Sequence, residues 1–446
     1  MTTNRDEQEM EKELKHINKQ PLPSGIDQQI FKGVARARHV KKRWEFVKHT
    51  GLSGVALLLF FVLSVNFIPG FSNVASNIPG LEKVVDLVEY DKGLQDVAKN
   101  NYVQVVDKSD TNEEVTFNID HLIIDKRRLV FFYSIETEAD YDIVGIRGAK
   151  VLDDQGEVID EYGVTLSRVD LYKGNNSSTI DFSWIQDQEF TENMTLQLQL
   201  VYYNEKDETE AYEIEGTYDI SFPVDLQKIQ MSKTYDINQS ASIDGQVIHF
   251  NKLESFPTRQ VLYLEYDENN SKKIMQLPGL RLVNEAGETV ATEDSSSLDG
   301  NKRIVSMTSN YFQDYEELYI VLDKVMAVDK DKAQVVVDLE KKQLLQAPDD
   351  RLELRDVSTD DNMFQLEDVL GLYFTFDKEE DGDEILRFEM AGFTDATGQE
   401  FGSVTNYSST NDFGYFIEDR QYSNPITIEL FQYPAYIEGD IRVRVK

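Results

Sequence analysis

The chain has 446 residues, a formal net charge of −37 at pH 7, 40 % hydrophobic and 11 % aromatic residues, and no cysteine. Without cysteine it cannot form disulfides, thiolate-bound iron–sulfur or zinc sites, or a cysteine nucleophile. We also expect no nucleic-acid partner, because binding a phosphate backbone needs Lys and Arg to displace its counterions.

Residues 1–49 form a basic segment, with 11 Lys and Arg against 7 Asp and Glu. A short charged helix is predicted at 6–17, and an amphipathic helix at 27–49, where apolar residues recur at helical spacing opposite the cations. This segment either lies on anionic lipid through its cations or docks a cytoplasmic partner. The residues expected to contact a partner are Ile26, Ile30, Val34, Arg36 and Arg38.

Residues 50–69 are predicted to form one transmembrane helix. No charged residue occurs between Thr50 and Leu81, and the apolar stretch is close to the roughly 20 residues that cross a bilayer. Because the basic flank precedes the span, we expect a cytoplasmic N-terminus and an extracellular C-terminus in a single-pass cell-membrane protein. A removable signal peptide would have a shorter basic region. The membrane-flanking residues are Lys41, Lys42, Arg43, Trp44 and Lys48.

Residues 70–101 are predicted to be a linker and a stalk helix. Pro79-Gly80 precedes Leu81, Val84, Val85 and Leu94, whose spacing predicts a single helix over 81–98.

From residue 102 onward, the chain alternates apolar and polar residues in short β-branched and aromatic runs. Turn residues interrupt these runs at intervals typical of antiparallel sandwiches. The predicted fold class is therefore mainly β, with tandem antiparallel β-sandwich (immunoglobulin-like) domains after the cytoplasmic helices and the transmembrane helix. The predicted units are 102–226, 236–341 and 350–446.

An internal repeat supports this division. Three segments share a glycine, a short apolar stretch, an Asx or acidic turn and a second glycine. Each lies between a strong aromatic strand upstream and two strands downstream, which predicts three related units. The segments are 148–159, 279–290 and 391–401.

The part after the span offers little catalytic chemistry. Its two histidines, His121 and His249, lie in predicted strands and are interpreted as structural residues. There is no nucleophile elbow outside the predicted span and no His or Cys set suited to zinc. The acidic stretches 377–384 and 356–362 could supply oxygen ligands to calcium, but their spacing does not fit a known calcium loop. We therefore expect no enzyme, no cofactor and no metal site.

The segments SNIPGLEKVVDLVEYDKGLQDVAKNNYVQVVDKS (76–109) and VTFNIDHLIIDKRRLVFFYSIE (115–136) resemble a Gram-positive single-span membrane family of largely unknown function. The resemblance covers about 50–140, and the middle unit 236–341 resembles a domain of unknown function that often follows it. Several members are identified as anti-sigma factors of extracytoplasmic-function sigma factors. The resemblance implies that the inside segment binds a sigma factor and that proteolysis breaks the link. The region for cleavage would include Asn66, Pro69 and Gly70.

Two functions follow as hypotheses. The first is a membrane-anchored envelope-stress regulator of the anti-sigma type, with an acidic extracellular sensor whose ligand is unknown. The alternative is a structural or adhesive cell-envelope protein whose basic segment only anchors it to the lipid bilayer.

Overall fold

The computed structural model describes residues 81–88, 91–205, 207–359, 368–376, 389–408 and 412–446. The predicted cytoplasmic helices, the predicted transmembrane helix and the linker up to residue 80 lie outside these residues. Within the described ranges, no helix is both long enough and apolar enough to cross a bilayer.

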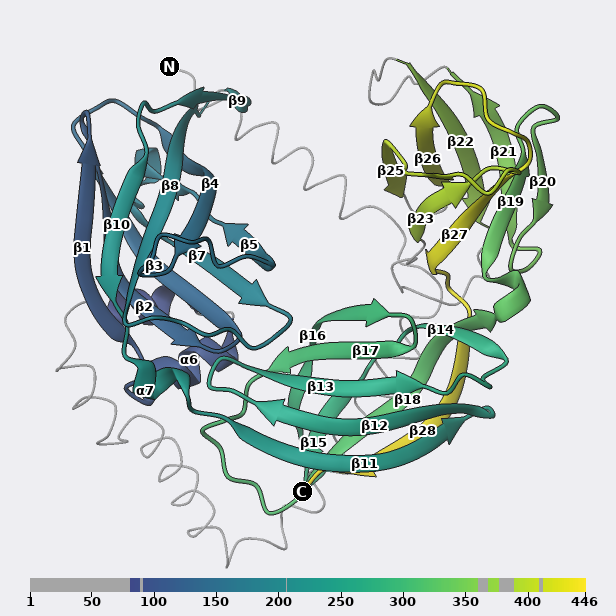
Figure 1. Cartoon of the computed structure of the whole chain (residues 1–446), viewed down its shortest axis with the longest axis horizontal. Coiled ribbons are helices and arrows are strands. Elements are labelled where there is room, and N and C mark those ends of the chain that lie inside the picture. Colours follow the sequence, from purple (N-terminus) through teal and green to yellow (C-terminus); the bar gives the residue numbers. More distant parts are fainter. Residues whose placement is uncertain (1–80, 89–90, 206, 360–367, 377–388, 409–411) are drawn as a thin grey trace, which may run out of the picture. The chain divides into compact units, whose positions relative to one another are not determined.

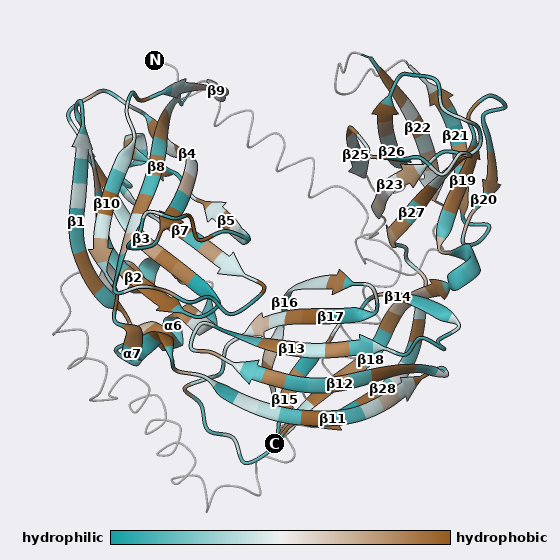
Figure 2. Ribbon diagram, viewed as in Figure 1, coloured by the Kyte–Doolittle hydropathy of each residue, from teal (hydrophilic) through white to brown (hydrophobic). Residues whose placement is uncertain are grey.

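The described chain is mainly β, as predicted, and its strands pair antiparallel (Figure 1). Many strands alternate buried and exposed residues, so apolar and polar bands follow each other along the ribbons (Figure 2). Side chains of consecutive strand residues point to opposite faces, so this alternation gives each sheet one face for a core. The alternation found in the sequence therefore identified the fold class.

The first unit consists of two sheets, one in the order β1-β2-β3-β7-β5 and the other in the order β10-β8-β4-β6, with β9 paired to β8. Their bounds are Gln104–Asn112 (β1), Val115–Asp125 (β2), Arg128–Thr137 (β3), Ile143–Leu152 (β4), Tyr162–Leu166 (β5), Val169–Asp170 (β6), Ser177–Trp184 (β7), Asn193–Asn204 (β8), Asp207–Glu213 (β9) and Tyr218–Pro223 (β10).

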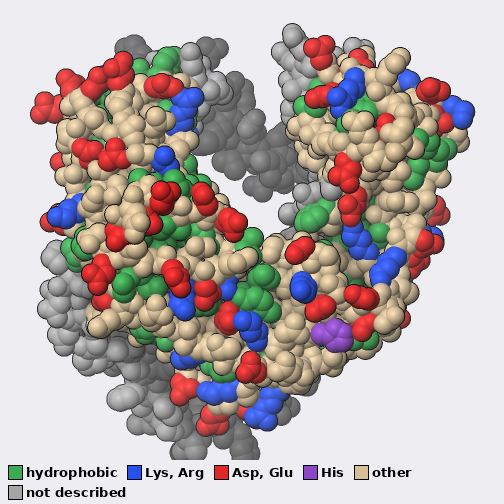
Figure 3. All heavy atoms as spheres, viewed as in Figure 1, with side chains coloured by type: hydrophobic (Ala, Val, Ile, Leu, Met, Phe, Trp, Pro, Cys, Tyr) green, Lys and Arg blue, Asp and Glu red, His purple; other side chains and the backbone are tan. Residues whose placement is uncertain are grey.

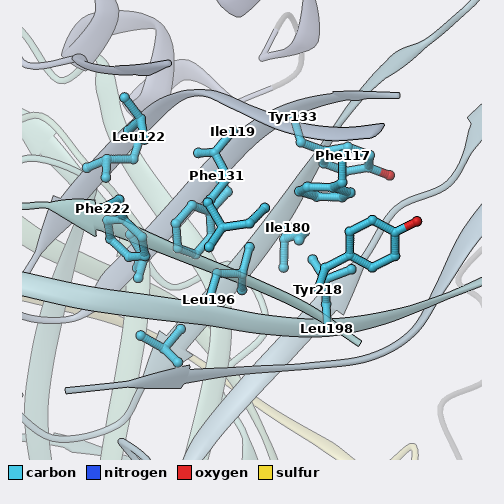
Figure 4. Close-up of a cluster of buried hydrophobic side chains, with 14 of the residues drawn as sticks. Phe117, Ile119, Leu122, Phe131, Tyr133, Ile180, Leu196, Leu198, Tyr218 and Phe222 are labelled. Carbon is cyan, nitrogen blue, oxygen red and sulfur yellow. The ribbon is translucent and has the colours of Figure 1, made fainter. Parts of the chain in front are cut away.

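Side chains from both sheets meet in the core of the first unit (Figure 4). Phe117 of β2 stacks on Tyr133 of β3 with ring centroids 4.7 Å apart. Phe131 meets Phe222 of β10 edge to face at 5.1 Å. All four rings are at most 2 % exposed. Full burial of side chains this large stabilises the unit by about 1.5–3 kcal/mol each.

The middle unit is a continuous set of strands in the order β11-β12-β13-β17-β16-β15-β18-β14, with β28 paired to β18. Strand β16 pairs with β15 up to Thr292 and with β17 from Glu293 onward, so it links the two halves of the set. The bounds are Lys233–Ile243 (β11), Gln246–Ser255 (β12), Arg259–Tyr266 (β13), Lys272–Gln276 (β14), Arg281–Asn284 (β15), Thr289–Asp299 (β16), Lys302–Thr308 (β17), Leu318–Asp329 (β18) and Tyr436–Arg444 (β28).

Strand β28 departs from the sequence-based division, which placed residues 436–444 in the third unit. It pairs with β18 from Tyr319↔Arg444 to Met326↔Tyr436. Its Ile441 and Val443 are buried in the core of the middle unit. The third unit is therefore inserted between β18 and β28. Alternation alone cannot show this, because it marks which face of a strand is buried and not which strand lies beside it.

The third unit contains the sheets β20-β19-β27-β23-β24 and β21-β22-β26-β25. Met275, Met326 and Val328, which belong to β14 and β18, are buried in its core. The bounds are Gln334–Asp338 (β19), Gln343–Gln346 (β20), Leu352–Ser358 (β21), Val369–Phe376 (β22), Glu389–Thr394 (β23), Glu400–Phe401 (β24), Thr405–Ser408 (β25), Asp412–Glu418 (β26) and Ile426–Gln432 (β27).

The predicted stalk helix is two short helices. The first, α5 (Leu81–Leu87), ends before a new helix, α6 (Lys92–Lys99), begins. Asp91 caps α6 and has an extended backbone, so one helix cannot run through it. Elsewhere in the described ranges, the helical pieces are α7 (Leu226–Ile229) and the 3₁₀ turns Leu171–Lys173 (η1) and Lys330–Lys332 (η2).

The three repeated segments each contain the same turn. In the first, the Asp153 carboxylate accepts the backbone N–H groups of residues 155 and 157, and Gly156 has φ of +83°. Asn284 and Asp395 accept the corresponding N–H groups in the other two segments. Gly287 and Gly398 likewise have positive φ, at +79° and +83°. This is an Asx turn closed by a left-handed glycine.

Acidic side chains are spread over the face shown in Figure 3, with Lys and Arg side chains between them. This dispersed charge is typical of a solvated surface and does not by itself indicate a binding site.

Candidate functional site at the junction of the first and middle units

The residues predicted from sequence as functional lie outside the described residues. These are the partner-contact and membrane-flanking residues between 26 and 48 and the cleavage region 66–70. The first described elements after them are helices α5 and α6, and the candidate site begins at α6, whose caps and buried side chains are described.

Helix α6 is fixed at both ends. The Asp91 carboxylate accepts the backbone N–H of Leu94 at 2.9 Å, which satisfies one of the free N–H groups of the first turn. At the C-terminal end, the Asn100 side chain donates to the Asp96 carbonyl oxygen at 2.7 Å. Gly93, Leu94, Val97 and Ala98 are buried. The helix is thus packed on one side as part of the folded body.

The buried side of α6 touches the middle unit. A Cβ added to Gly93 would lie 2.9 Å from the Thr258 carbonyl oxygen and 3.4 Å from Cβ of Ser309. Gln313 donates its side-chain amide to Asp96 at 3.3 Å. These approaches require a glycine at position 93, because a larger residue would push against the backbone of the middle unit.

The turn between β2 and β3 also contacts the middle unit, through Asp125, which is fully buried. One carboxylate oxygen accepts the backbone N–H groups of Arg127 and Arg128 at 2.9 and 3.1 Å. The other accepts the backbone N–H and the hydroxyl of Thr258 at 2.8 and 2.7 Å. Burial raises the pKa of Asp125, while the hydrogen bonds from Thr258 and Arg127 oppose that rise.

Arg127 reaches across to the middle unit from the same turn and is 3 % exposed. Its Nε lies 2.7 Å from Asp187 and its Nη2 lies 3.3 Å from Glu254. It also donates to the Tyr263 hydroxyl, and its guanidinium stands over the Phe256 ring at 5.5 Å. Burial opposes ionisation of Glu254, but hydrogen bonds from Lys252 and Tyr263 and the charge of Arg127 hold its pKa below the ordinary value.

Arg128 ties helix α6 to the first unit. Its Nη1 donates to the free oxygen of the capping residue Asp91 at 2.9 Å. Its Nε and Nη2 form a bidentate pair with Asp181 of β7, at 3.0 and 2.6 Å. Burial alone would lower the pKa of Arg128, but the two carboxylates raise it. Asp91 therefore serves both the helix cap and the ion pair, so movement of α6 away from β3 would break the ion pair with Arg128.

Away from this junction, hydrogen bonds link the side chains of Ser240, His249 and Asp267. The Ser240 hydroxyl lies 2.8 Å from Nδ1 of His249, and Nε2 of His249 lies 3.1 Å from Asp267. A serine hydrolase uses the opposite nitrogens, with serine at Nε2 and the acid at Nδ1. We therefore interpret these three residues as a surface hydrogen-bond network. Sequence reasoning missed it because Asp267 lies in a turn 18 residues beyond His249.

Of the two acidic stretches that could supply oxygen ligands to calcium, 377–384 lies outside the described residues, as do residues 360–362 of the stretch 356–362. Among the residues that are described, no group of three or more His, Asp and Glu side chains could hold a metal ion.

The comparisons with known proteins match both sides of this junction. A domain of unknown function, DUF4179, matches residues 42–137, and a family of unknown function, DUF5643, matches residues 232–354. The first match contains Asp91, Asp125 and both arginines of the turn, while the second contains Glu254 and Thr258. Most residues of the junction therefore lie in one or the other of the two matched regions.

No curated protein matches the chain. One solved structure, described as the conserved domain protein from Bacillus anthracis, is 15 % identical with a TM-score of 0.37, over 55 % of this chain and 86 % of that chain. A likeness at this level does not bear on function.

Proposed function

We propose that this chain is a membrane-anchored envelope-stress regulator of the anti-sigma type. Residues 1–49 hold a cytoplasmic sigma factor, a transmembrane helix at 50–69 crosses the cell membrane once, and the acidic immunoglobulin-like units after it sense the exterior. Cleavage near Asn66, Pro69 and Gly70 releases the inside segment when the exterior responds.

Fixation of α6 to both units is the main support for this proposal. A signal from the exterior must reach the span through the chain that follows it. A flexible linker would not transmit a change in orientation, because its ends move independently. Helix α6 begins 23 residues after position 69. Arg128 pairs with its capping residue on one side, and on the other the helix packs closely against the Thr258 backbone and accepts a hydrogen bond from Gln313. A rearrangement between the units would therefore move this helix.

The alternative function, a structural or adhesive envelope protein, needs no such coupling. An anchor works equally well with a loose connection, and its basic segment needs only to lie on anionic lipid. The two functions differ in what residues 1–49 bind.

Affinity purification of the full chain in detergent separates them. The regulator predicts that a sigma factor co-purifies with the wild-type chain. Ile30→Asp would weaken its retention about tenfold or more, because a charge would enter an apolar contact. Gln29→Asp is the matched control, since it places the same side chain one position away, off the apolar face. Absence of any sigma factor from the wild-type preparation, or equal retention by both variants, would favour the anchor.

A further inference from the structure

A groove lies where the middle and third units are joined, between the β14–β15 loop, β16, β18 and the end of β27. Its volume is about 860 Å³, which is in the size range of ligand pockets. Outside the groove, the Lys273 ammonium joins β14 to β27 by pairing with Glu429 at 2.5 Å and donating to the Leu430 carbonyl oxygen at 3.2 Å. The two strands that contribute Gln276 and Phe431 to the groove are therefore tied to each other.

Two aromatic rings line this groove and face solvent. Phe431 is 44 % exposed and Tyr436 is 37 % exposed, and both belong to the small set of large hydrophobic residues exposed in the described chain. The Lys324 ammonium stands 5.0 Å from the centroid of the Tyr436 ring. Exposed rings gathered in a groove can contact an apolar ligand surface with little loss of side-chain entropy.

Arg303, which is 2 % exposed, fixes two polar side chains that line the groove, Gln276 and Ser296. Its Nη2 donates to Oε1 of Gln276 at 2.5 Å and to the Ser296 hydroxyl oxygen at 2.7 Å. Its Nη1 donates to the Met275 carbonyl oxygen at 2.6 Å. Because Arg303 donates to these oxygen atoms, the N–H groups of Gln276 and the O–H group of Ser296 are left as the donors that a ligand could use.

The groove is balanced in charge within a strongly acidic chain. Glu293 and Asp294 line it beside Lys324, and the Arg303 guanidinium lies beneath it. Asp294 lies at a bulge in the pairing of β16 with β17, and a bulge changes the direction of side chains at that point. The carboxylates can accept hydrogen bonds while the net charge near the groove is close to zero. A polyanion or a polycation would find no complementary field there.

We propose that this groove binds a neutral oligosaccharide. A sugar ring has apolar C–H faces that stack on aromatic rings, and a rim of hydroxyls that both donate and accept hydrogen bonds. Phe431 provides the main stacking surface, and Tyr436 adds the part of its ring that the Lys324 ammonium does not cover. Gln276 and Ser296 provide donors, and Glu293 and Asp294 provide acceptors. The inference goes beyond the proposed function and does not rest on a sigma factor being bound.

Isothermal titration calorimetry on the full chain in zwitterionic detergent tests this inference. The probes are neutral tetrasaccharides of β-linked N-acetylglucosamine, β-linked glucose and α-linked glucose, with a cationic peptide and a polyphosphate for comparison. We expect at least one tetrasaccharide to bind. Phe431→Ala should weaken it about tenfold, which is about 1.4 kcal/mol, because the ring that stacks on the sugar is removed. Phe431→Tyr should retain binding.

Tyr172→Ala is the matched control, because Tyr172 is also an aromatic residue with 37 % exposure but lies in the first unit. It should leave the affinity unchanged. The inference is wrong if no tetrasaccharide binds at millimolar concentration, or if Phe431→Ala and Tyr172→Ala bind it equally well. It is also wrong if the peptide or the polyphosphate alone binds in a manner that depends on Phe431.

Discussion

Asp125 and Thr258 are 133 residues apart in the chain, yet Thr258 donates both its backbone N–H and its hydroxyl to one carboxylate oxygen of Asp125, at 2.8 and 2.7 Å. Both residues are at most 2 % exposed. The contact joins a turn of the first unit to a turn of the middle unit. Buried hydrogen bonds to a carboxylate are directional, so they fix the mutual orientation of the two turns.

Asp125→Ala should destabilise the first unit. It would leave buried N–H donors of Arg127 and Thr258 without an acceptor, at a cost of about 1–3 kcal/mol. Trp184 is 3 % exposed in the core of this unit and reports its unfolding. Urea unfolding followed by fluorescence in a Trp44→Phe background isolates that signal, because the chain has two tryptophans. Asp140→Ala, an exposed carboxylate in the same unit, should leave the midpoint unchanged.

Gly93→Ala should also destabilise the junction, although alanine favours helix formation. The added Cβ would lie 2.9 Å from the Thr258 carbonyl oxygen, so the helix or the middle unit must shift. We expect a loss of about 1–3 kcal/mol, as for overpacked sites, in place of the gain of about 1 kcal/mol at an open helix position. The same fluorescence assay measures it. Lys92→Ala, at an exposed position in the same turn, is the control, and a stabilised Gly93→Ala protein would contradict the packing of α6.

The repeated Asx turn makes a separate prediction at Gly287, which has φ of +79°. Gly287→Ala should destabilise the middle unit by about 1–2 kcal/mol, because an L-residue is strained in the left-handed region. A Cβ at this position would meet no neighbour within 4 Å, so the cost is conformational. Gly148→Ala is the control, since that glycine has equal space but no positive φ. Equal melting temperatures for the two variants would argue against the turn.

The stability of the third unit should depend on pH through Asp338. Hydrogen bonds from the Lys341 backbone and ammonium and from the Asn424 amide lower its pKa from 3.8 to about 2. A lowered pKa means that the folded chain favours the carboxylate. Its stabilising effect is present above pH 3.8 and is lost as the pH falls towards 2.

Asp338→Asn should therefore be less stable than wild type at neutral pH, and the difference should shrink between pH 4 and pH 2. Denaturation midpoints of both proteins across this range give the difference directly. A gap that stays constant down to pH 2 would mean that Asp338 does not titrate as described.

Much of the fold followed from the sequence, because alternation is a local signal. The short β-branched and aromatic runs after residue 102 predict strands, and those that contain Phe117, Phe131 and Leu196 form β2, β3 and β8. The position of β28 could not be found in this way, because pairing with β18 depends on packing across more than 100 residues. The break before α6 could have been found. Asp91 precedes a helical pattern with the residue type that caps helices, and the continuous apolar spacing of Val84, Val88 and Leu94 concealed it.

The candidate site was only partly visible in the sequence. The turn Asp125-Lys126-Arg127-Arg128 lies inside the segment that carried the family resemblance, but its charges resemble an ordinary solvated turn. Burial of Asp125 depends on Thr258, and no local pattern links the two positions. The paired arrangement therefore required the structure.

Genome-wide transcription in cells tests the central claim, that the exterior is coupled through the junction to a sigma factor held inside. The strains carry wild type, Ile30→Asp, Arg128→Ala, or Arg147→Ala as a control that removes an exposed arginine of the first unit. Only strains whose proteins reach the same level in the membrane and the same resistance to protease are compared. We predict that Arg128→Ala alters the same set of transcripts as Ile30→Asp, while Arg147→Ala alters none. Transcription identical to wild type in both Ile30→Asp and Arg128→Ala strains would contradict the account.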